Sequence, residues 1–431
     1  MQRFAQTALS QWKKSKNRKP LIIQGARQVG KTWLMKEFGR REYEQVAYIN
    51  FESSDSLKSI FREDFDIGRL ITAFQIETGI RIRPDNTLII LDEIQEVERG
   101  ITSLKYFCED APQYHIIAAG SLLGITLHQN TSFPVGKVDF LTLYPMSFNE
   151  FLLALGQEQL YELLESNDWP MITTFKTKLI GHLRHYYFIG GMPEAVSSFI
   201  SENDFDRVRT IQKNILSAYE HDFSKHAPAE IVPRIKMLWQ SIPSQLSKEN
   251  KKFIYGVVKQ GGRAKEFELA LAWMADCGLV HKIQRISKAA VPLVAYQDTS
   301  AFKLYILDVG LLSAMGGLTK QTILLGNSIF SEFKGALAEQ FVLQHLKNRQ
   351  NVQVFYWSSD TSSGELDFVI QNNDRVIPIE VKAEENLKAK SLKSFFEKFS
   401  PTISVRTSMS DYRKESWLVN IPLYAIDSFP F

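Results

Sequence analysis

Cysteine is scarce in this sequence. Its two cysteines, Cys108 and Cys277, lie far apart and do not have the spacing of metal ligands. This usage excludes a disulfide framework and predicts a reduced, cytoplasmic protein. Apolar runs of membrane-spanning length are absent, and the N-terminus lacks the apolar core of a signal peptide, so we expect no membrane partner. Internal repeats and low-complexity segments are absent as well.

A strong net charge is also missing. The value of +3 is too small to indicate nucleic acid by itself, and the basic cluster at residues 13–19 is typical of a solvated surface. Hydrophobic residues make up 44% of the chain and charged residues 23%, as in soluble globular proteins. Because 431 residues exceed what one compact core accommodates, we expect two or three domains.

A glycine-rich stretch near the N-terminus carries the most specific pattern. The apolar residues 21–23 lead into Gly25, and Gly30, Lys31 and Thr32 complete G-x-x-x-x-G-K-[ST], a phosphate-binding loop. An apolar strand before the pattern and a helix-capable segment after it are the context that this loop requires. The residues that we expect to bind the nucleotide here are Gly25, Ala26, Arg27, Gln28, Val29, Gly30, Lys31, Thr32 and Trp33.

Two carboxylates follow a second apolar strand, residues 87–91. Ligands of open α/β sheets bind at the carboxyl ends of strands, where Asp92 and Glu93 would lie. We expect Thr32 and Asp92 to hold Mg²⁺, Asp92 doing so through water, and Lys31 to reach the β- and γ-phosphates. Glu93 would activate the attacking water. The two patterns together predict an ATPase with ATP or ADP and Mg²⁺ as ligands.

A third apolar strand, residues 115–119, ends in Gly120 and Ser121. Related ATPases carry a polar residue that senses the γ-phosphate at this point, and Ser121 is the candidate. A helix N-cap is an equally good interpretation of Ser121, because serine is favoured at that position.

Several segments together resemble a family of prokaryotic AAA-type ATPases. They are G-A-R-Q-V-G-K-T (25–32), T-L-I-I-L-D-E-I-Q (87–95), A-G-S (119–121), L-Y-P-M-S-F-N-E-F (143–151), Y-F-I-G-G-M-P-E (187–194), L-Y-I-L-D-V-G-L-L (304–312), G-A-L-A-E (335–339), G-E-L-D-F (364–368) and I-P-I-E-V-K (377–382). The resemblance covers nearly the whole chain. It implies an ATPase followed by a domain of unknown function with a nuclease-like end, and an ATP-dependent homo-oligomer.

One position departs from that family. Gly-Arg is usual before the last strand of the ATPase, whereas this chain has Gly136 and Lys137. Lysine supplies charge without the planar fork of arginine, so an arginine-finger role between subunits is in doubt.

The middle of the chain, residues 156–300, is expected to be helical, with a winged helix at about 235–295. Helices at 253–259 and 265–277 would be followed by a hairpin that pairs residues 279–283 with 291–294. Contact with DNA and docking of a protein both stay open. Basic residues favour DNA, but the second helix also carries Glu266, Glu268 and Asp276. The basic residues are Arg263, Lys265, Lys282, Arg285 and Lys288.

Four residues suggest a second site in the C-terminal third: Glu339, Asp367, Glu380 and Lys382. Glu339 lies on an expected helix, residues 335–346, and the other three lie on two adjacent strands. Asp367 and Glu380 could hold Mg²⁺, and Lys382 could orient water. The spacing D-x₁₂-E-x-K resembles the restriction-endonuclease-like superfamily, whose core is a mixed sheet flanked by helices. A salt-bridged surface without cleavage is the alternative.

The sequence therefore predicts an α/β protein in three parts. Residues 1–155 would form a P-loop ATPase with a parallel sheet, 156–300 a helical and winged-helix region, and 301–431 a restriction-endonuclease-like domain with a mixed sheet. One hypothesis is an ATPase whose cycle is coupled to a nuclease-like, DNA-directed domain. The other is a nucleotide-dependent binding switch whose nuclease-like domain is catalytically silent and recognises a protein or DNA partner.

Overall fold

The chain divides into two compact units. The computed structural model describes residues 1–63, 65–120, 134–248, 250–325, 331–349, 352–359, 364–385 and 388–431. The N-terminal unit comprises Arg3–Tyr144 together with the short segment Asp276–Leu279. The C-terminal unit comprises Met1–Gln2, Pro145–Ala275 and Val280–Phe431. No helix of these described ranges is both long and apolar enough to span a lipid bilayer.

A five-stranded parallel sheet forms the centre of the N-terminal unit, in the order β2-β3-β4-β1-β5. The strands are β1 (Leu21–Gln24), β2 (Gln45–Asn50), β3 (Thr87–Asp92), β4 (His115–Ala119) and β5 (Asp139–Thr142). The helices are α1 (Ala5–Lys14), α2 (Lys31–Glu42), α3 (Asp55–Glu63), α4 (Ile67–Thr78) and α5 (Gly100–Asp110), with the 3₁₀ turn η1 (Ile94–Glu96). The parallel sheet of a P-loop protein is thus confirmed.

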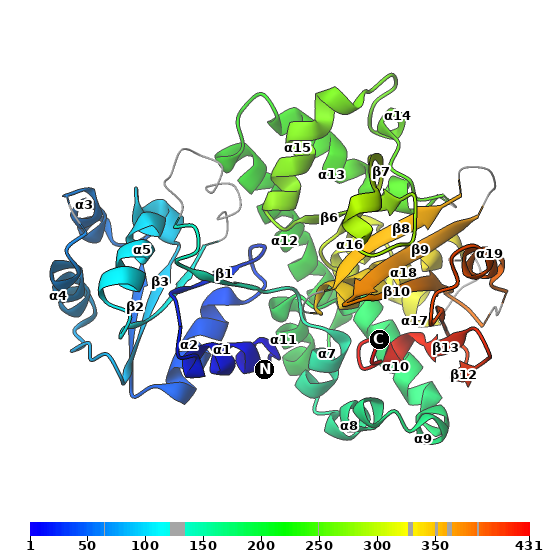
Figure 1. Ribbon diagram of the computed structural model, residues 1–431, viewed down its shortest axis with the longest axis horizontal. Helices are drawn as coiled ribbons and strands as arrows, with labels where there is room; N and C mark the ends of the chain where they lie inside the picture. The colour runs from blue at the N-terminus through cyan, green and yellow to red at the C-terminus, as the bar shows by residue number, and fades with distance from the viewer. Residues whose placement is uncertain are drawn as a thin grey trace. The chain divides into compact units, whose positions relative to one another are not determined.

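Both faces of this sheet are covered, which explains why its inner strands β1, β3 and β4 are buried without alternation (Figure 1). On one face, Ile49 and Leu91 pack in a core with Phe74 of α4 and Leu104 of α5. On the other face α2 approaches closely: a Cβ on Gly39 would meet the side chains of β2 and β3. This layering brings the carboxyl ends of β1 and β3 to the same edge of the sheet.

The C-terminal unit begins with a series of helices. They are α7 (Phe148–Ala154), α8 (Glu158–Ser166), α9 (Trp169–Thr174), α10 (Lys176–Ile189), α11 (Pro193–Glu202), α12 (Phe205–His226), α13 (Val232–Leu246), α14 (Tyr255–Val258) and α15 (Ala264–Asp276). The expected helical middle of the chain is confirmed.

An eight-stranded mixed sheet follows, in the order β12-β13-β11-β10-β9-β8-β6-β7. Its strands are β6 (Val280–Ile286), β7 (Gln297–Ile306), β8 (Gln353–Ser358), β9 (Glu365–Asn372), β10 (Arg375–Val381), β11 (Val405–Ser408), β12 (Arg413–Lys414) and β13 (Val419–Pro422). Its helices are α16 (Val309–Met315), α17 (Lys320–Leu325), α18 (Ser331–Lys347) and α19 (Lys390–Phe399). The pairing of β9 with β10 is antiparallel and that of β10 with β11 is parallel, which confirms the expected mixed sheet.

The hairpin expected for a winged helix was wrong in its second strand. Strand β6 pairs with β7, not with residues 291–294, part of which belongs to the 3₁₀ turn η2 (Leu293–Tyr296). Pro292 has no N–H to donate to a strand ladder, which disfavours pairing by this segment. The hairpin also joins the eight-stranded sheet, because β6 lies beside β8. The first strand of the predicted wing, which β6 contains from residue 280 on, is therefore part of the C-terminal sheet, whereas residues 291–294 are not.

A buried carboxylate joins segments that are far apart in the sequence. Asp308 accepts hydrogen bonds from the backbone N–H of Gly191 at 2.6 Å and of Leu311 at 2.9 Å. The carbonyl of Gly191 in turn accepts from the N–H of Met146 at 2.7 Å. Gln344 of α18 donates to Asp308 at 3.3 Å. These contacts leave no room for a side chain at residues 190–191. The G-G-M-P segment therefore has a structural role.

Candidate functional site

The phosphate-binding loop connects β1 to α2. Gly25 has φ of 143°, and a Cβ there would lie 2.2 Å from the backbone oxygen of Leu143. Only glycine fits that position, because a side chain would clash with the backbone of Leu143, the residue that follows β5. Gly30 has φ of 94° and immediately precedes α2, whose first residue is Lys31. The N-terminus of α2, which carries partial positive charge, therefore faces the loop.

Lys31 is held inside this loop. Its Nζ donates to the backbone oxygens of Gly25 and Ala26, both at 2.8 Å. Burial lowers the pKa of Lys31 to about 8, and the nearby carboxylates of Glu93 and Asp92 oppose that change. A polyanion in the loop would stabilise the charged ammonium in the same way, because an opposite charge raises the pKa of a lysine.

A hydrogen bond joins the two nucleotide patterns that the sequence predicted. The hydroxyl of Thr32 donates to Oδ2 of Asp92 at 2.8 Å, and the hydroxyl of Tyr48 donates to the same oxygen at 3.0 Å. Asp92 is buried at the end of β3. A hydroxyl and a carboxylate at this distance form an oxygen set that suits Mg²⁺, which prefers hard oxygen ligands.

Glu93 follows Asp92 in a left-handed backbone conformation, with φ of 51°. Its N–H donates to Oδ1 of Asp92 at 3.2 Å, and its side chain accepts from Nε2 of Gln95 at 2.6 Å. This turn directs Glu93 away from the strand ladder while keeping it beside Asp92. The carboxylate is only partly buried, so a water molecule can reach it.

The remaining loop residues divide by exposure. Ala26 and Val29 are buried, so their contribution to a ligand would come from the backbone. Arg27 is half-buried, Gln28 is exposed with φ of 65°, and Trp33 is 42% exposed at the start of α2. Ser121, the predicted γ-phosphate sensor, lies outside the described residues.

Arg3 is a residue that sequence reasoning missed. It is 4% exposed, and its guanidinium donates to the carbonyl of Val29 at 3.0 Å and to that of Tyr144 at 2.6 Å. It thereby connects the loop to the chain beyond β5. No motif surrounds Arg3, so the sequence offers no signal for this contact.

The segment Asp276–Leu279 also lies against the loop, although it is distant in sequence. A Cβ on Gly278 would lie 3.3 Å from the backbone nitrogen of Ala26. The contact leaves room for no larger residue without a shift, which explains the glycine at this point.

Glu339, one of the four residues predicted for the second site, lies on α18 among cations. Its carboxylate is 2.5 Å from Nζ of Lys251 and 4.0 Å from Nζ of Lys303, and it accepts from the hydroxyl of Tyr305 at 2.9 Å. Burial tends to raise the pKa of Glu339, but Lys251 and Lys303 outweigh it, so that pKa lies below its usual value. Glu339 is therefore an ionised member of a salt-bridge cluster.

Lys303 of β7 occupies the middle of this cluster. It is fully buried, and its Nζ lies 2.5 Å from Glu365 and 3.8 Å from Asp367. Burial acts to lower the pKa of Lys303, but the carboxylates of Glu339, Glu365 and Asp367 outweigh it and raise that pKa. Lys303 therefore stays charged. Neither Lys303 nor Lys251 was part of the predicted site.

Asp367 and Glu380 make separate contacts. Asp367 accepts from the N–H of Val381 at 2.8 Å, and burial followed by the charge of Glu339 raises its pKa to about 7. Glu380 of β10 is 2.8 Å from Nζ of Lys382. Within the described ranges, no group of three or more acidic, histidine or cysteine side chains is arranged to hold a metal ion.

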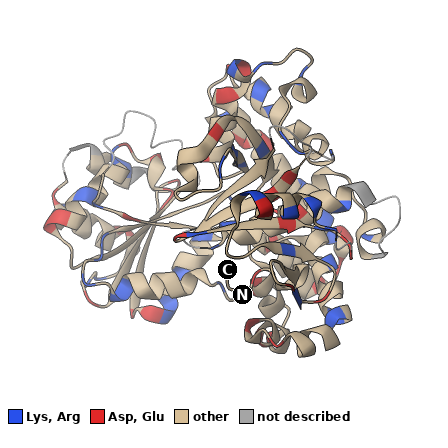
Figure 2. Cartoon of the chain, turned by 45° about the vertical axis from the view of Figure 1, so that its right-hand side comes forward, with Lys and Arg blue, Asp and Glu red and all other residues tan. Residues whose placement is uncertain are grey.

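The basic residues predicted to meet DNA phosphates are partly engaged already. Arg285 pairs with Asp298 at 3.0 Å, and Lys282 lies over the ring of Phe302, 4.6 Å from its centroid. Arg263 and Lys265 are exposed beside acidic residues of α15. Figure 2 shows positive and negative residues interspersed over the ribbon.

Lys137, which replaces the usual arginine, pairs with Glu109 of the same unit at 2.9 Å. Both side chains are partly exposed. Glu109 therefore pairs with the charge that an arginine finger would supply to the nucleotide site of a neighbouring subunit.

Comparison with protein families divides the chain into three matches. Residues 17–152 match an AAA domain, residues 180–322 match a domain of unknown function (DUF8612), and residues 334–426 match another domain of unknown function (DUF4143). No curated protein matches the sequence.

Two solved structures are similar over much of the chain. A Walker-type ATPase of Pyrococcus abyssi, PABY2304, is 13% identical with a TM-score of 0.46, and the match covers 73% of this chain and 95% of that one. The Aeropyrum pernix ORC1 protein in complex with DNA is 12% identical with a TM-score of 0.27, covering 73% and 90%. The family matches therefore support a P-loop ATPase domain within residues 17–152 and identify a domain of unknown function, DUF4143, within residues 334–426.

Proposed function

We propose that this protein binds and hydrolyses ATP with Mg²⁺ and works as a nucleotide-dependent switch. The observation that carries the proposal is the hydrogen bond between Thr32 and Asp92, which unites the phosphate loop with the acidic end of β3. Mg²⁺, when bound, would neutralise charge on the phosphates. Thr32 and Asp92 would hold it, Lys31 would bind the β- and γ-phosphates, and Glu93 would take a proton from water.

Replacement of Lys31 tests nucleotide binding. Lys31→Ala removes a buried charge at the loop, so the affinity for a fluorescent ATP analogue should fall about 100-fold, as for the loss of two charge-assisted hydrogen bonds. Arg40→Ala, an exposed change on the same helix α2, is the matched control and should bind as wild type does. Equal affinity in the two variants would contradict the role of Lys31.

For the C-terminal unit we favour a catalytically silent, nuclease-like domain over a nuclease. Close carboxylates repel unless a cation compensates them. Lys251 and Lys303 supply that compensation to Glu339 and Glu365, and they supply it only in part to Asp367, whose pKa stays raised. In this proposal Glu339 and Asp367 belong to a salt-bridge cluster with Lys251 and Lys303, and Glu380 pairs separately with Lys382, so none of the four has a catalytic role. The expected domain boundaries at residues 155/156 and 300/301 stay predictions, and the second of them falls within β7.

The absence of a catalytic metal site in the C-terminal unit can be tested by thermal melting of the full chain with and without Mn²⁺, in the absence of nucleotide. Mn²⁺ should shift the melting temperature equally in wild type, Asp367→Asn and Asp374→Asn, the last being an exposed control on the β9–β10 hairpin. The wild type should also leave linear DNA intact. A stabilisation that Asp367→Asn and Glu380→Gln remove but Asp374→Asn retains, together with DNA cleavage, would favour the nuclease.

For the partner of the switch we favour protein over DNA. Exposed Arg263, just before α15, and exposed Lys265 on α15 lie close in sequence to exposed Glu266 and Glu268, so their charges balance. Affinity for duplex DNA that falls steeply with salt would reverse this preference.

We propose that the chain self-associates weakly and only with ATP bound, because Glu109 pairs with Lys137. Light scattering should then show a modest rise in mass with a non-hydrolysable ATP analogue, and an unchanged mass would contradict it.

A further inference from the structure

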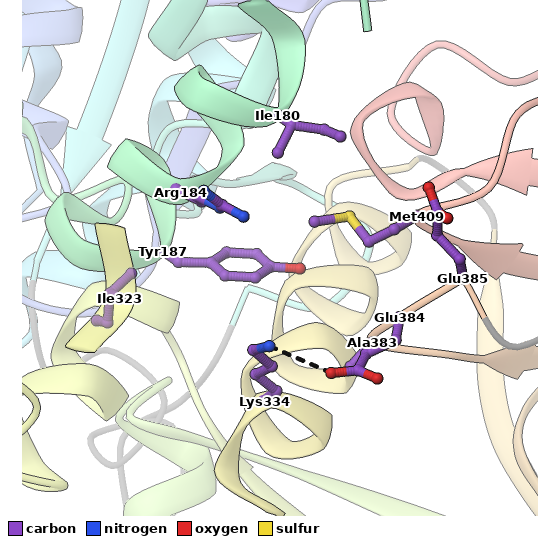
Figure 3. A pocket seen from close by; sticks show the side chains of 9 residues that line it. All are labelled: Ile180, Arg184, Tyr187, Ile323, Lys334, Ala383, Glu384, Glu385 and Met409. Carbon is purple, nitrogen blue, oxygen red and sulfur yellow. Dashed lines mark hydrogen bonds and ion pairs between the residues drawn. The ribbon is translucent and has the colours of Figure 1, made fainter. Parts of the chain in front are cut away.

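A cavity of about 400 Å³ lies within the C-terminal unit, between helix α10 and the chain that follows β10 (Figure 3). Its size falls in the range of small-molecule sites. Helix α17 contributes Ile323, α18 contributes Lys334, and Met409 follows β11. Neither the phosphate loop nor the four predicted C-terminal residues line it.

Helix α10 presents three different side chains to this cavity: Ile180, Arg184 and Tyr187. Residues spaced by four and three lie on one face of a helix. Figure 3 shows Arg184 and Tyr187 directed into the same space, with Met409 opposite the tyrosine ring. One helix face therefore offers an apolar contact, a cation and a hydroxyl.

The hydroxyl of Tyr187 is an unsatisfied group. The side chain is 7% exposed, and no described residue forms a hydrogen bond with this hydroxyl. Buried polar atoms usually have a partner, so the cavity is the direction from which one would come. Burial raises the pKa of Tyr187, so the hydroxyl keeps its proton and can donate it in a hydrogen bond.

The two cations that line the cavity, Arg184 and Lys334, are engaged differently. Lys334 pairs with Glu384 at 3.2 Å, and Glu385 pairs with Lys176 at 2.8 Å. Arg184 donates to the carbonyl of Leu324 at 3.1 Å, and among the described residues it forms no ion pair with a carboxylate. A guanidinium retains further donors after one such bond, and it recognises carboxylate and phosphate groups well.

We propose that this cavity binds a small organic anion with an apolar or aromatic body. Its carboxylate or phosphate would accept hydrogen bonds from Arg184 and Tyr187, and its body would lie against Ile180, Ile323 and Met409. The site is distinct from the ATP site and does not depend on the function proposed for it.

Two probes separate the sources of the anion: indole-3-acetate carries a carboxylate, and phenyl phosphate carries a phosphate. Each is titrated into the full chain with excess ADP, which keeps the phosphate loop from contributing, and binding is followed by ligand-observed NMR. We expect at least one probe to bind the wild type at millimolar concentrations or below. Absence of binding by both would overturn the proposal.

Variants then test the two donors. Arg184→Gln should lower the affinity for the probe about tenfold or more, as for loss of a charge-assisted hydrogen bond, and Arg184→Lys should lower that affinity less. Tyr187→Phe keeps the ring and should also weaken it, by up to about tenfold. Arg207→Gln, an exposed change on α12, is the matched control.

Tyr187→Phe provides a second test if Arg184→Gln does not fold. It removes only a hydroxyl that forms no hydrogen bond with a described residue. Its melting temperature should equal or exceed that of wild type. Probe affinities that are the same in Arg184→Gln, Tyr187→Phe and Arg207→Gln would place the probe elsewhere and overturn the proposal.

Discussion

At the scale of single residues, buried charge distinguishes the two units. Lys31 is buried against backbone oxygens, which leaves its charge available to a ligand. Lys303 is buried against three carboxylates, which use its charge within the protein. The same residue type therefore serves binding in one place and stability in the other.

Asp308 supports a prediction for pH dependence. Burial raises its pKa to about 6, although backbone N–H donors from Gly191 and Leu311 favour the charged form. The unfolded state, with an ordinary pKa near 3.9, releases this proton first. The stability that Asp308 contributes should therefore fall as pH rises from about 4 to about 6 and stay level above that.

Asp308→Asn removes this titration. Calorimetric melting of wild type and variant from pH 4 to 8 should show a difference in melting temperature that narrows up to about pH 6 and then stays constant. The variant should be less stable throughout, because the two backbone N–H groups bond to different carboxylate oxygens and asparagine replaces one of these oxygens with an NH₂ donor. A difference independent of pH would show that Asp308 titrates normally in the folded protein.

Sequence reasoning at this scale succeeded where a local pattern fixes the neighbours. Thr32 and Asp92 were expected together, and the structure joins them by a hydrogen bond. Lys251 and Lys303 were not expected near Glu339, because they come from elements about 88 and 36 residues away with no shared pattern. Long-range charge pairing of this kind leaves no periodic signal.

At the scale of elements, the end of α10 depends on backbone contacts that exclude side chains. A Cβ on Gly191 would lie 2.1 Å from the backbone oxygen of Met146. Gly191→Ala should therefore destabilise the C-terminal unit by about 1–3 kcal/mol or more, as for an overpacked site. Gly181→Ala lies within α10, where an added Cβ meets nothing within 4 Å, and should be neutral or slightly stabilising.

Thermal melting of the two alanine variants checks this expectation. A lower melting temperature for Gly191→Ala than for Gly181→Ala supports a structural role for the G-G-M-P segment. Equal melting temperatures would mean that the loop around Met146 moves aside without cost.

Secondary structure was predictable where periodicity is strong. The strands that precede Gly25 and Asp92 are apolar throughout and were placed correctly, because a parallel sheet buries both faces. The partner of β6 was misplaced, because residues 291–294 and β7 are both apolar in part and only tertiary pairing decides between them. Register between distant strands is set by the fold, which local composition does not encode.

At the scale of the whole molecule, the central claim is that the N-terminal unit hydrolyses ATP through Glu93. The claim rests on a parallel sheet that brings the phosphate loop and the acidic end of β3 to one edge. The comparisons support a P-loop ATPase domain over residues 17–152. The C-terminal cluster and cavity extend the account but do not determine it.

Steady-state ATP turnover by Glu93→Gln tests this claim most directly, with ATP binding measured on the same protein. Glu96→Gln, an exposed change in the same turn η1, is the matched control. The account predicts that Glu93→Gln binds ATP as wild type does but turns it over about 100-fold more slowly, as for loss of a general base, while Glu96→Gln is unaffected. Turnover by Glu93→Gln at the wild-type rate would contradict the account.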